Sequence, residues 1–323
     1  MHPMTAPGPR SWAHGSGGQL RAVWRISAFV SVSVLSLGIV TALMQQLLSV
    51  VGPTVGGMLS PADLINAIGT FAAVAFVLHS VDSQSWSAIG LQSASWKLPK
   101  LANGTAFGTL AIVATCALLV ASGNLQFEHD ANWTLTIGDV VTTSPGSAWL
   151  LATLRISLLL APAALYEELI FRGYLWRVCV DSANPTVAIV VTSILFGFAH
   201  LQNPGVDALA IGNVILAGFA LGIVRQRTGS LPAAIAAHMS WNWVMAAALH
   251  VQVSGQALST PGYRTIPHGA SWISGGDWGP EGGFVASIVL LALVAYGIRK
   301  TSFEKQIPQR THDRFTRSVN GAH

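Results

Sequence analysis

Charged residues are scarce in this chain. Asp, Glu, Lys and Arg make up only 9% of its 323 residues, whereas 51% are hydrophobic and the mean hydropathy is +0.53. Charged residues form about a quarter of an ordinary soluble domain, so the composition excludes that class and predicts a membrane protein. The 11 tryptophans and 32 glycines agree with this prediction, because Trp favours the membrane interface and Gly allows spanning helices to pack closely.

Cysteine is also nearly absent. Cys116 and Cys179 lie in or beside apolar segments without a partner at a metal-site spacing, so the sequence indicates neither a disulfide framework nor a cysteine-based metal site. The His-Glu-x-x-His motif of helical zinc sites is missing too. The formal charge of +4 lies mostly in the tails of the chain. That pattern indicates contact with the lipid bilayer and no nucleic acid partner.

Long hydrophobic runs predict about eight transmembrane helices, and therefore an all-α polytopic membrane helix bundle. The first run exceeds the roughly 20 residues that cross a bilayer and lacks a small-residue cleavage site, so we expect a retained span. We expect an N-terminal tail over 1–25, the bundle over 26–298 with a loop at 251–283 folded over one mouth, and a basic tail over 299–323. The runs cover residues 26–51, 62–81, 101–122, 147–180, 186–201, 207–224, 231–250 and 284–298.

Lys and Arg are distributed unevenly between the two ends of this expected bundle. With eight spans and a cytoplasmic N-terminus, 15 of them fall inside, only Arg264 falls outside, and Arg155 lies within a helix. Cytoplasmic segments of membrane proteins are enriched in Lys and Arg. We therefore expect a multi-pass plasma-membrane protein with both termini in the cytoplasm and the loops around Glu128 and Trp278 outside.

The fourth run contains two adjacent acids and an arginine, Glu167, Glu168 and Arg172. Ionisable groups at membrane depth are unfavourable and persist mainly where they face the interior of a bundle. On a helix, Glu168 and Arg172 are i,i+4 neighbours with the acid first, the better orientation for an ion pair. Glu167 points about 100° away from its neighbour, so it remains available as a base. The alternative is an ordinary solvated Glu–Arg pair at a helix end.

Three later polar residues fall where they can meet Glu167. Counting from residue 183 at the turn, Glu167 lies 16 residues before it and His200 lies 17 after, so antiparallel helices carry both side chains to nearly the same depth. His238 and Asn242 are an i,i+4 pair on one face of the seventh run. Each residue alone is typical of an interhelical hydrogen bond. Together with an unpaired glutamate, they form a constellation suited to general-base hydrolysis.

These polar residues resemble the motifs of a known protease family. In chain order they are similar to the EExxxR, FxxxH and HxxxN motifs of the CAAX-protease and bacteriocin-processing (CPBP) family, the Abi or type II CAAX endopeptidase group of intramembrane proteases. All of them lie within residues 147–250, which we expect to be the catalytic core, and the rest of the chain carries no matching motif. The matching residues are Glu167-Glu168 with Arg172, Phe196 with His200, and His238 with Asn242.

The resemblance implies an intramembrane endopeptidase, a hydrolase that cuts a membrane-anchored peptide or protein. By the resemblance, Glu167 with His200 activates the attacking water. His238 and Asn242 then hold the oxyanion of the tetrahedral intermediate. The supporting residues are Glu168 and Arg172.

The resemblance leaves the cofactor and the substrate open, because both a metalloprotease and a metal-free glutamate mechanism are argued for the family. Two Glu and two His are compatible with a zinc ion that keeps an open water position, and the candidate ligands are then Glu167, His200 and His238. A prenylated C-terminal motif, a peptide precursor and another membrane protein all fit as substrates.

Two other classes of function compete with this interpretation. A non-catalytic protein, either a transporter or an immunity protein that binds a peptide, would use the same polar cavity, although the paired, interrupted spans of many transporters are not visible. Other classes of intramembrane protease have only faint signals, and both lie in an expected outside loop without a partner in a span. These signals are Gly275-Gly276-Asp277 for an aspartyl type and Gly269-Ala270-Ser271 for a serine type.

Overall fold

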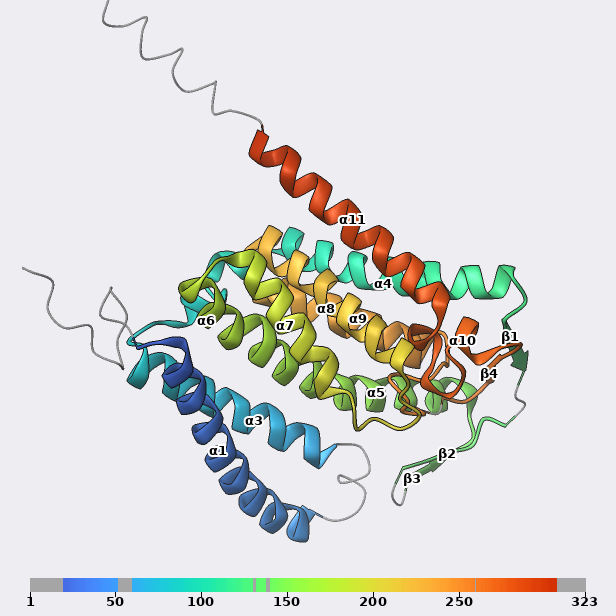
Figure 1. Cartoon of the computed structure of the whole chain (residues 1–323). Coiled ribbons are helices and arrows are strands. Elements are labelled where there is room, and N and C mark those ends of the chain that lie inside the picture. The colour runs from blue at the N-terminus through green and yellow to red at the C-terminus, as the bar shows by residue number, and fades with distance from the viewer. Residues whose placement is uncertain (1–19, 52–59, 130–131, 138–139, 259, 307–323) are drawn as a thin grey trace, which may run out of the picture.

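The computed structural model describes residues 20–51, 60–129, 132–137, 140–258 and 260–306, and these form a bundle of helices (Figure 1). Every predicted apolar run is helical over most of its length, which confirms the all-α class. Most of the two expected tails, 1–25 and 299–323, lies outside the described residues. The helices are α1 (Ala22–Val51), α3 (Pro61–Phe76) with the π-helical turn η1 (Val77–Val81), α4 (Leu98–Ala121), α5 (Pro145–Glu168) with the π-helical turn η4 (Leu169–Tyr174) and α6 (Leu175–Ser182), α7 (Pro185–Ala199), α8 (Ala208–Thr228), α9 (Leu231–Trp243) with the π-helical turn η5 (Val244–Ala248), and α11 (Phe284–Gln306).

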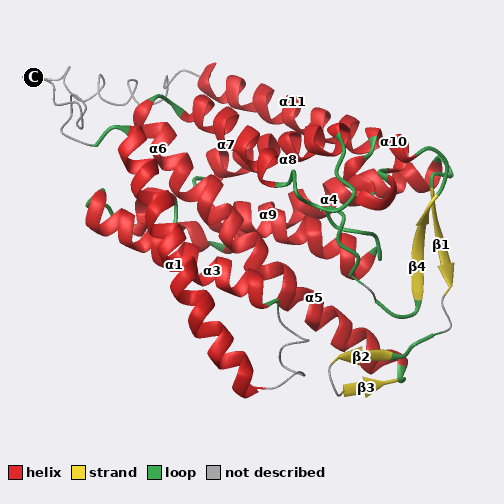
Figure 2. Ribbon diagram, turned by 60° about the horizontal axis from the view of Figure 1, so that its bottom comes forward, coloured by secondary structure: helices red, strands yellow, loops and turns green. Residues whose placement is uncertain are grey.

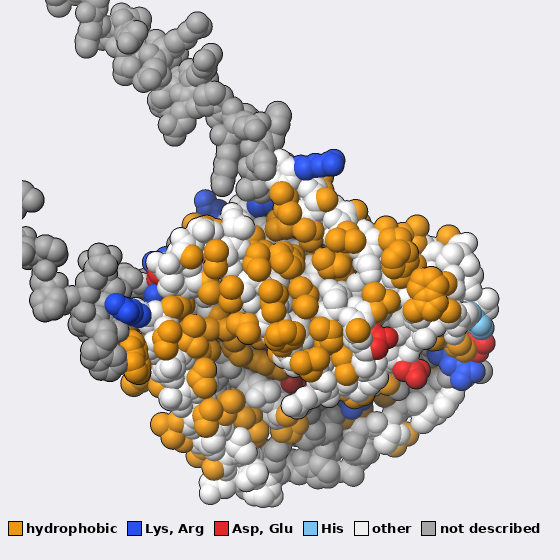
Figure 3. All heavy atoms as spheres, in the orientation of Figure 1, with side chains coloured by type: hydrophobic (Ala, Val, Ile, Leu, Met, Phe, Trp, Pro, Cys, Tyr) orange, Lys and Arg blue, Asp and Glu red, His pale blue; other side chains and the backbone are white. Residues whose placement is uncertain are grey.

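Five helical segments in the described part of the chain are long and apolar enough to cross a membrane, and two shorter apolar helices accompany them. The five are Ala22–Leu47, Pro61–Val81, Leu98–Ala121, Pro145–Ser182 and Ala208–Thr228, and the shorter ones are Pro185–Ala199 and Phe284–Arg299. Figure 3 shows hydrophobic side chains across the middle of one face, with Lys and Arg at its edges. Exposed apolar surface of this extent suits lipid rather than water, so the protein is membrane-embedded.

Side-chain caps set where four of these helices begin. Ser60 accepts a hydrogen bond from the backbone of Asp63 at the start of α3, and Asn184 does the same for Val187 at the start of α7. Asp207 and Ser230 cap α8 and α9 in the same way. Each cap satisfies a backbone N–H that the first helical turn leaves without a partner. The Asn184-Pro185 turn also places α7 antiparallel to α6, as the sequence predicts.

The loops that follow α4 and α9 meet at one end of the bundle. Strand β1 (Leu125–His129) pairs antiparallel with β4 (Tyr263–Pro267), and Arg264 bonds Glu128 at 3.1 Å across this ladder (Figure 2). A second small pair joins β2 (Leu135–Ile137) to β3 (Val140–Thr142). The loops around Glu128 and Trp278 therefore lie at the same end, as predicted, while the side of the membrane they face stays a prediction.

A buried charge cluster holds the opposite end together. Arg25 on α1 bonds Asp82 after η1 at 2.8 Å and Asp181 on α6 at 3.0 Å. One turn further along α1, the ring of Phe29 packs on Tyr174, with 4.9 Å between their centroids. Arg25 and Phe29 are the only buried side chains among those described on α1. The first two turns of α1 therefore hold its buried side chains, while a later turn packs Leu37 against Gly69 of α3.

Close backbone contacts bring the remaining helices together. A Cβ on Gly104 of α4 would lie 2.1 Å from the carbonyl oxygen of Ala233 on α9, and one on Gly108 would lie 2.0 Å from that of Ala237. Close packing also occurs at Gly218 of α8, where a Cβ would lie 2.9 Å from the backbone of α7. Small residues thus let α4, α7, α8 and α9 surround a common centre.

Candidate active site

The two adjacent glutamates lie at the end of α5, where the helix widens into the π-helical turn η4. Such widened turns are frequent at functional sites. Arg172 is fully buried; its Nη1 donates to Glu168 Oε1 at 2.9 Å and its Nη2 donates to the carbonyl oxygen of Gly218 on α8 at 3.1 Å. The predicted Glu168–Arg172 ion pair is present, and it also ties the motif to α8.

Glu168 has a second partner that sequence reasoning missed. The Nδ1 atom of His238, on α9, donates to Glu168 Oε1 at 3.0 Å. A carboxylate accepts hydrogen bonds only, so the proton of this bond belongs to His238 Nδ1. Glu168 thus supports both the arginine and the histidine, and it fixes the imidazole ring with its Nε2 toward Glu167.

Glu167 faces both histidines, as the depth argument predicts for His200. Its Oε2 atom lies 4.0 Å from His200 Nε2 and 3.9 Å from His238 Nε2. The same oxygen is buried without a hydrogen-bond partner among the described residues, although the side chain as a whole is 17% exposed. A buried carboxylate oxygen without a partner is unfavourable unless water or a ligand satisfies it.

The orientation of His200 follows from its backbone contact. Its Nδ1 lies 2.8 Å from the carbonyl oxygen of Phe196. A carbonyl cannot donate, so Nδ1 carries the proton and a neutral His200 presents an Nε2 lone pair to Glu167. The Phe196 ring lies beside His200, with 4.7 Å between ring centroids, and under the Arg172 guanidinium at 4.3 Å. Phe196 therefore packs between the acidic motif and His200.

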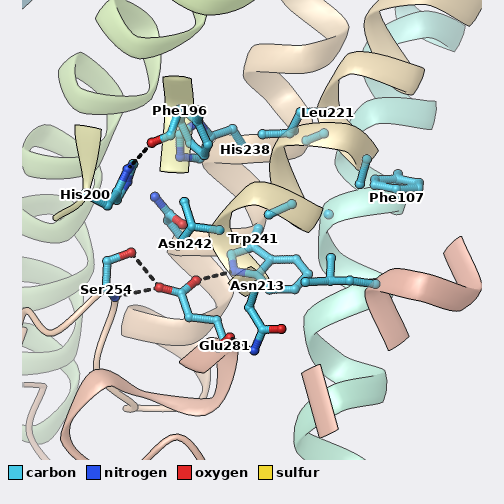
Figure 4. A pocket seen from close by; sticks show the side chains of 16 residues that line it. Phe107, Phe196, His200, Asn213, Leu221, His238, Trp241, Asn242, Ser254 and Glu281 are labelled. Atoms are coloured by element: carbon cyan, nitrogen blue, oxygen red, sulfur yellow. Dashed lines mark hydrogen bonds between the residues drawn. The ribbon is translucent and has the colours of Figure 1, made fainter. Parts of the chain in front are cut away.

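A small cavity of about 50 Å³ joins His200, His238 and Asn242 (Figure 4). This volume has room for ordered water. The amide of Asn242 makes no hydrogen bond within the described part of the chain, so its donors remain free for a ligand. The structure thus brings Glu167, His200 and His238 together, and it places Asn242 in the same pocket.

Other polar residues of this pocket escaped sequence reasoning. The segment after α9 contributes Ser254 and Glu281 to the lining, and α8 contributes Asn213. Glu281 is buried in η7 (Pro280–Gly282). A buried acid in a glycine-rich loop has no helical periodicity to reveal it, and the only signal is its position among very few charged residues.

The spacing of the candidate metal ligands does not fit a zinc site. Ligand atoms at about 2.0–2.2 Å from a tetrahedral zinc ion are roughly 3.4 Å apart, whereas Glu167 Oε2 lies 3.9 and 4.0 Å from the two imidazole nitrogens. No group of three His, Cys, Asp or Glu side chains in the described residues is arranged to hold a metal ion. We therefore derive no catalytic step through a metal.

Residues 147–244 match the model of a protein family described as type II CAAX prenyl endopeptidase Rce1-like. The match begins at the start of α5 and ends two residues after Asn242, so it contains every candidate site residue. No curated protein matches the chain.

Proposed function

Because residues 147–244 belong to the Rce1-like family of type II CAAX prenyl endopeptidases, we propose that this chain is an intramembrane endopeptidase. Its substrate is a membrane-associated peptide, lipidated or a precursor, cut near the end that lies in the bilayer. The bundle over 26–298, with its catalytic core at 147–250, lies in the plasma membrane with both termini in the cytoplasm.

The observation that carries this proposal is the unpartnered carboxylate oxygen of Glu167 between two imidazole nitrogens. Two hydrogen bonds of about 2.8 Å reach across a gap of 4 Å when one water joins the atoms. A water bound by Glu167 Oε2 and His200 Nε2 meets two acceptors, because neutral His200 presents a lone pair there. Both hydrogens of that water point at bases, which leaves its oxygen lone pairs free to attack.

The reaction then follows general-base hydrolysis. Glu167 takes one proton from the water as its oxygen bonds to the scissile carbonyl carbon, and the carbonyl oxygen becomes an oxyanion. The same proton passes to the leaving nitrogen as the C–N bond breaks, which yields a carboxylic acid and an amine. Glu167 is regenerated as a carboxylate and no other reactant is required.

Asn242 and His238 serve as the donors to the oxyanion. The Asn242 amide is free to donate, and each such donor contributes about 10²–10³ in rate in a comparable soluble protease. His238 already gives its Nδ1 proton to Glu168, so its donation to the oxyanion uses a second proton on Nε2. The cluster then carries two negative charges, from the glutamates, and two positive charges, from Arg172 and the imidazolium.

Cleavage of membrane-anchored peptides by the purified protein tests the proposal. A panel of lipidated and unlipidated fluorogenic peptides is incubated with the wild-type protein, with and without a chelator, and with Glu167→Gln as the inactive control. We expect the wild-type protein to cleave members of the panel and Glu167→Gln to cleave none. Loss of wild-type cleavage in the presence of the chelator would assign the activity to a metal. Peptide binding without cleavage of any panel member would instead favour the non-catalytic binding function.

A further inference from the structure

Another buried carboxylate, Glu281, lines the same pocket as His200 (Figure 4). We infer that Glu281 is a positioning residue of the peptidase: it holds Trp241, and with it the next residue, Asn242, where the oxyanion forms. This inference rests on the proposed function and adds to it the residue that keeps the oxyanion donor in place.

The carboxylate of Glu281 accepts three hydrogen bonds from protein donors. Its Oε2 accepts from the Trp241 indole Nε1 at 2.9 Å. Its Oε1 accepts from the backbone nitrogen of Ser254 at 2.7 Å and from the Ser254 hydroxyl at 2.5 Å. These three bonds occupy most of the lone-pair positions of the carboxylate. Glu281 therefore acts through its neighbours.

The indole of Trp241 is the link between Glu281 and the proposed site. Trp241 has a single N–H group, and the bond to Glu281 uses it. Trp241 and Asn242 are consecutive on α9, near the point where this helix widens into η5. A shift of Trp241 carries the Asn242 backbone with it. Misplacement of a catalytic group by 1 Å can lower the rate about 10²-fold.

Glu281 is itself attached to two other helices. The amide of Asn213 on α8 donates to the carbonyl oxygens of Glu281 and Gly283, both at 2.8 Å. The Asn213 carbonyl in turn accepts from the Ser287 hydroxyl on α11 at 2.6 Å. The segment is also close-packed, since Gly279 has a φ of +104° and a Cβ there would lie 2.2 Å from the carbonyl oxygen of Gln252. Contacts with α8 and α11 therefore hold Glu281 in place, and α9 is bonded to its carboxylate through Trp241.

The test compares Glu281→Gln with Glu128→Gln in peptide cleavage. Glu128 is a matched control, because it is an exposed acid in a loop at the same end of the bundle and touches only Arg264 among the contacts of its side chain. Glu281→Gln should lower kcat about 10²-fold with little change in KM, because the oxyanion donor is displaced while peptide binding remains. Glu128→Gln should match the wild type.

A double-mutant cycle with Trp241→Phe separates positioning from a general loss of structure. Trp241→Phe removes the donor of the same bond, so the double variant should lose no more activity than the worse single variant. Losses that multiply in the double variant would overturn the inference, and so would a wild-type kcat in Glu281→Gln. If Glu281→Gln does not fold, Ser254→Ala replaces it, since that change removes one of the three donors. The inference then requires a lower kcat at unchanged KM, and a wild-type kcat overturns it.

A readout without catalysis distinguishes failure of this inference from failure of the proposed function. Histidine modification by diethyl pyrocarbonate is followed residue by residue by mass spectrometry, with exposed His79 at the other end of the bundle as internal reference. If Glu281→Gln loosens the residues around the pocket, modification of His200 and His238 should rise several-fold while that of His79 stays unchanged. Equal protection of the two pocket histidines in the wild type and the variant contradicts the positioning role even if no peptide is ever cleaved.

Discussion

Substitution of the two adjacent glutamates by glutamine should have different effects, because their surroundings differ. Glu167→Gln should abolish turnover and leave the protein folded, since Glu167 Oε2 bonds no described residue. Glu168→Gln should chiefly destabilise the fold, since Glu168 is fully buried and its Oε1 accepts from both Arg172 and His238.

The difference in stability between the two variants follows from the burial of the Glu168–Arg172 ion pair. Arg172 and Glu168 are both 0% exposed, with 2.9 Å between Nη1 and Oε1. Removing one partner of such a pair lowers the free energy of unfolding by roughly 3–5 kcal/mol, and Arg172→Ala should have a loss of the same size. Glu167→Gln removes no such ion pair and keeps an oxygen that accepts hydrogen bonds, so its loss should stay within about 1 kcal/mol.

Two measurements on the same detergent preparations check this prediction: thermal unfolding and peptide cleavage. Glu168→Gln should also reduce cleavage, though less than Glu167→Gln, because it weakens the support of His238. Turnover by Glu167→Gln would refute the assignment of the base. Equal activity losses in two equally stable variants would show that the glutamates are not divided between catalysis and structure.

Three further predictions follow from the geometry. Asn242→Ala should lower kcat about 10²–10³-fold with little change in KM, and a weaker peptide affinity at unchanged kcat would instead assign Asn242 to binding. Gly108→Ala should destabilise the protein by about 1–3 kcal/mol in thermal unfolding, because a Cβ would meet the carbonyl oxygen of Ala237 at 2.0 Å; the control Gly212→Ala, which meets nothing within 4 Å, should not. Cysteines placed at Lys97 and Trp272 should be labelled by an impermeant reagent from opposite sides of the membrane, and labelling of both from one side contradicts the expected topology.

The apolar runs were enough to predict the helices, because a bilayer requires long apolar segments with internally bonded backbones. Helical spacing also predicted the Glu168–Arg172 pair, and residue counting from the Asn184-Pro185 turn predicted that Glu167 and His200 share a depth. Each of these features depends on the geometry of one helix or one hairpin, which is local in sequence.

The rest of the site depends on how distant helices are rotated against each other. The bond from His238 to Glu168 joins residues 70 apart, and no periodicity in either helix specifies which face meets the other. The widened turn η4 is likewise a product of packing, and an apolar run has no pattern that reveals it. The contacts of Glu281 with Trp241 and Ser254 come from a loop whose path is set by tertiary contacts and by glycine at positive φ.

The positions along α1 differ in how strictly the fold limits which residue they can hold. The buried side chains among those described on α1 are Arg25 and Phe29, while its later turns expose Val34 to 67% and pack Leu37 against Gly69 of α3. The exposed positions of these later turns require only an apolar, helix-forming residue, whereas Leu37 also has to fit against α3. Exposed positions such as Val34 therefore tolerate exchange among apolar residues, whereas a single change at Arg25 would leave Asp82 without its cation and Asp181 with Arg177 alone.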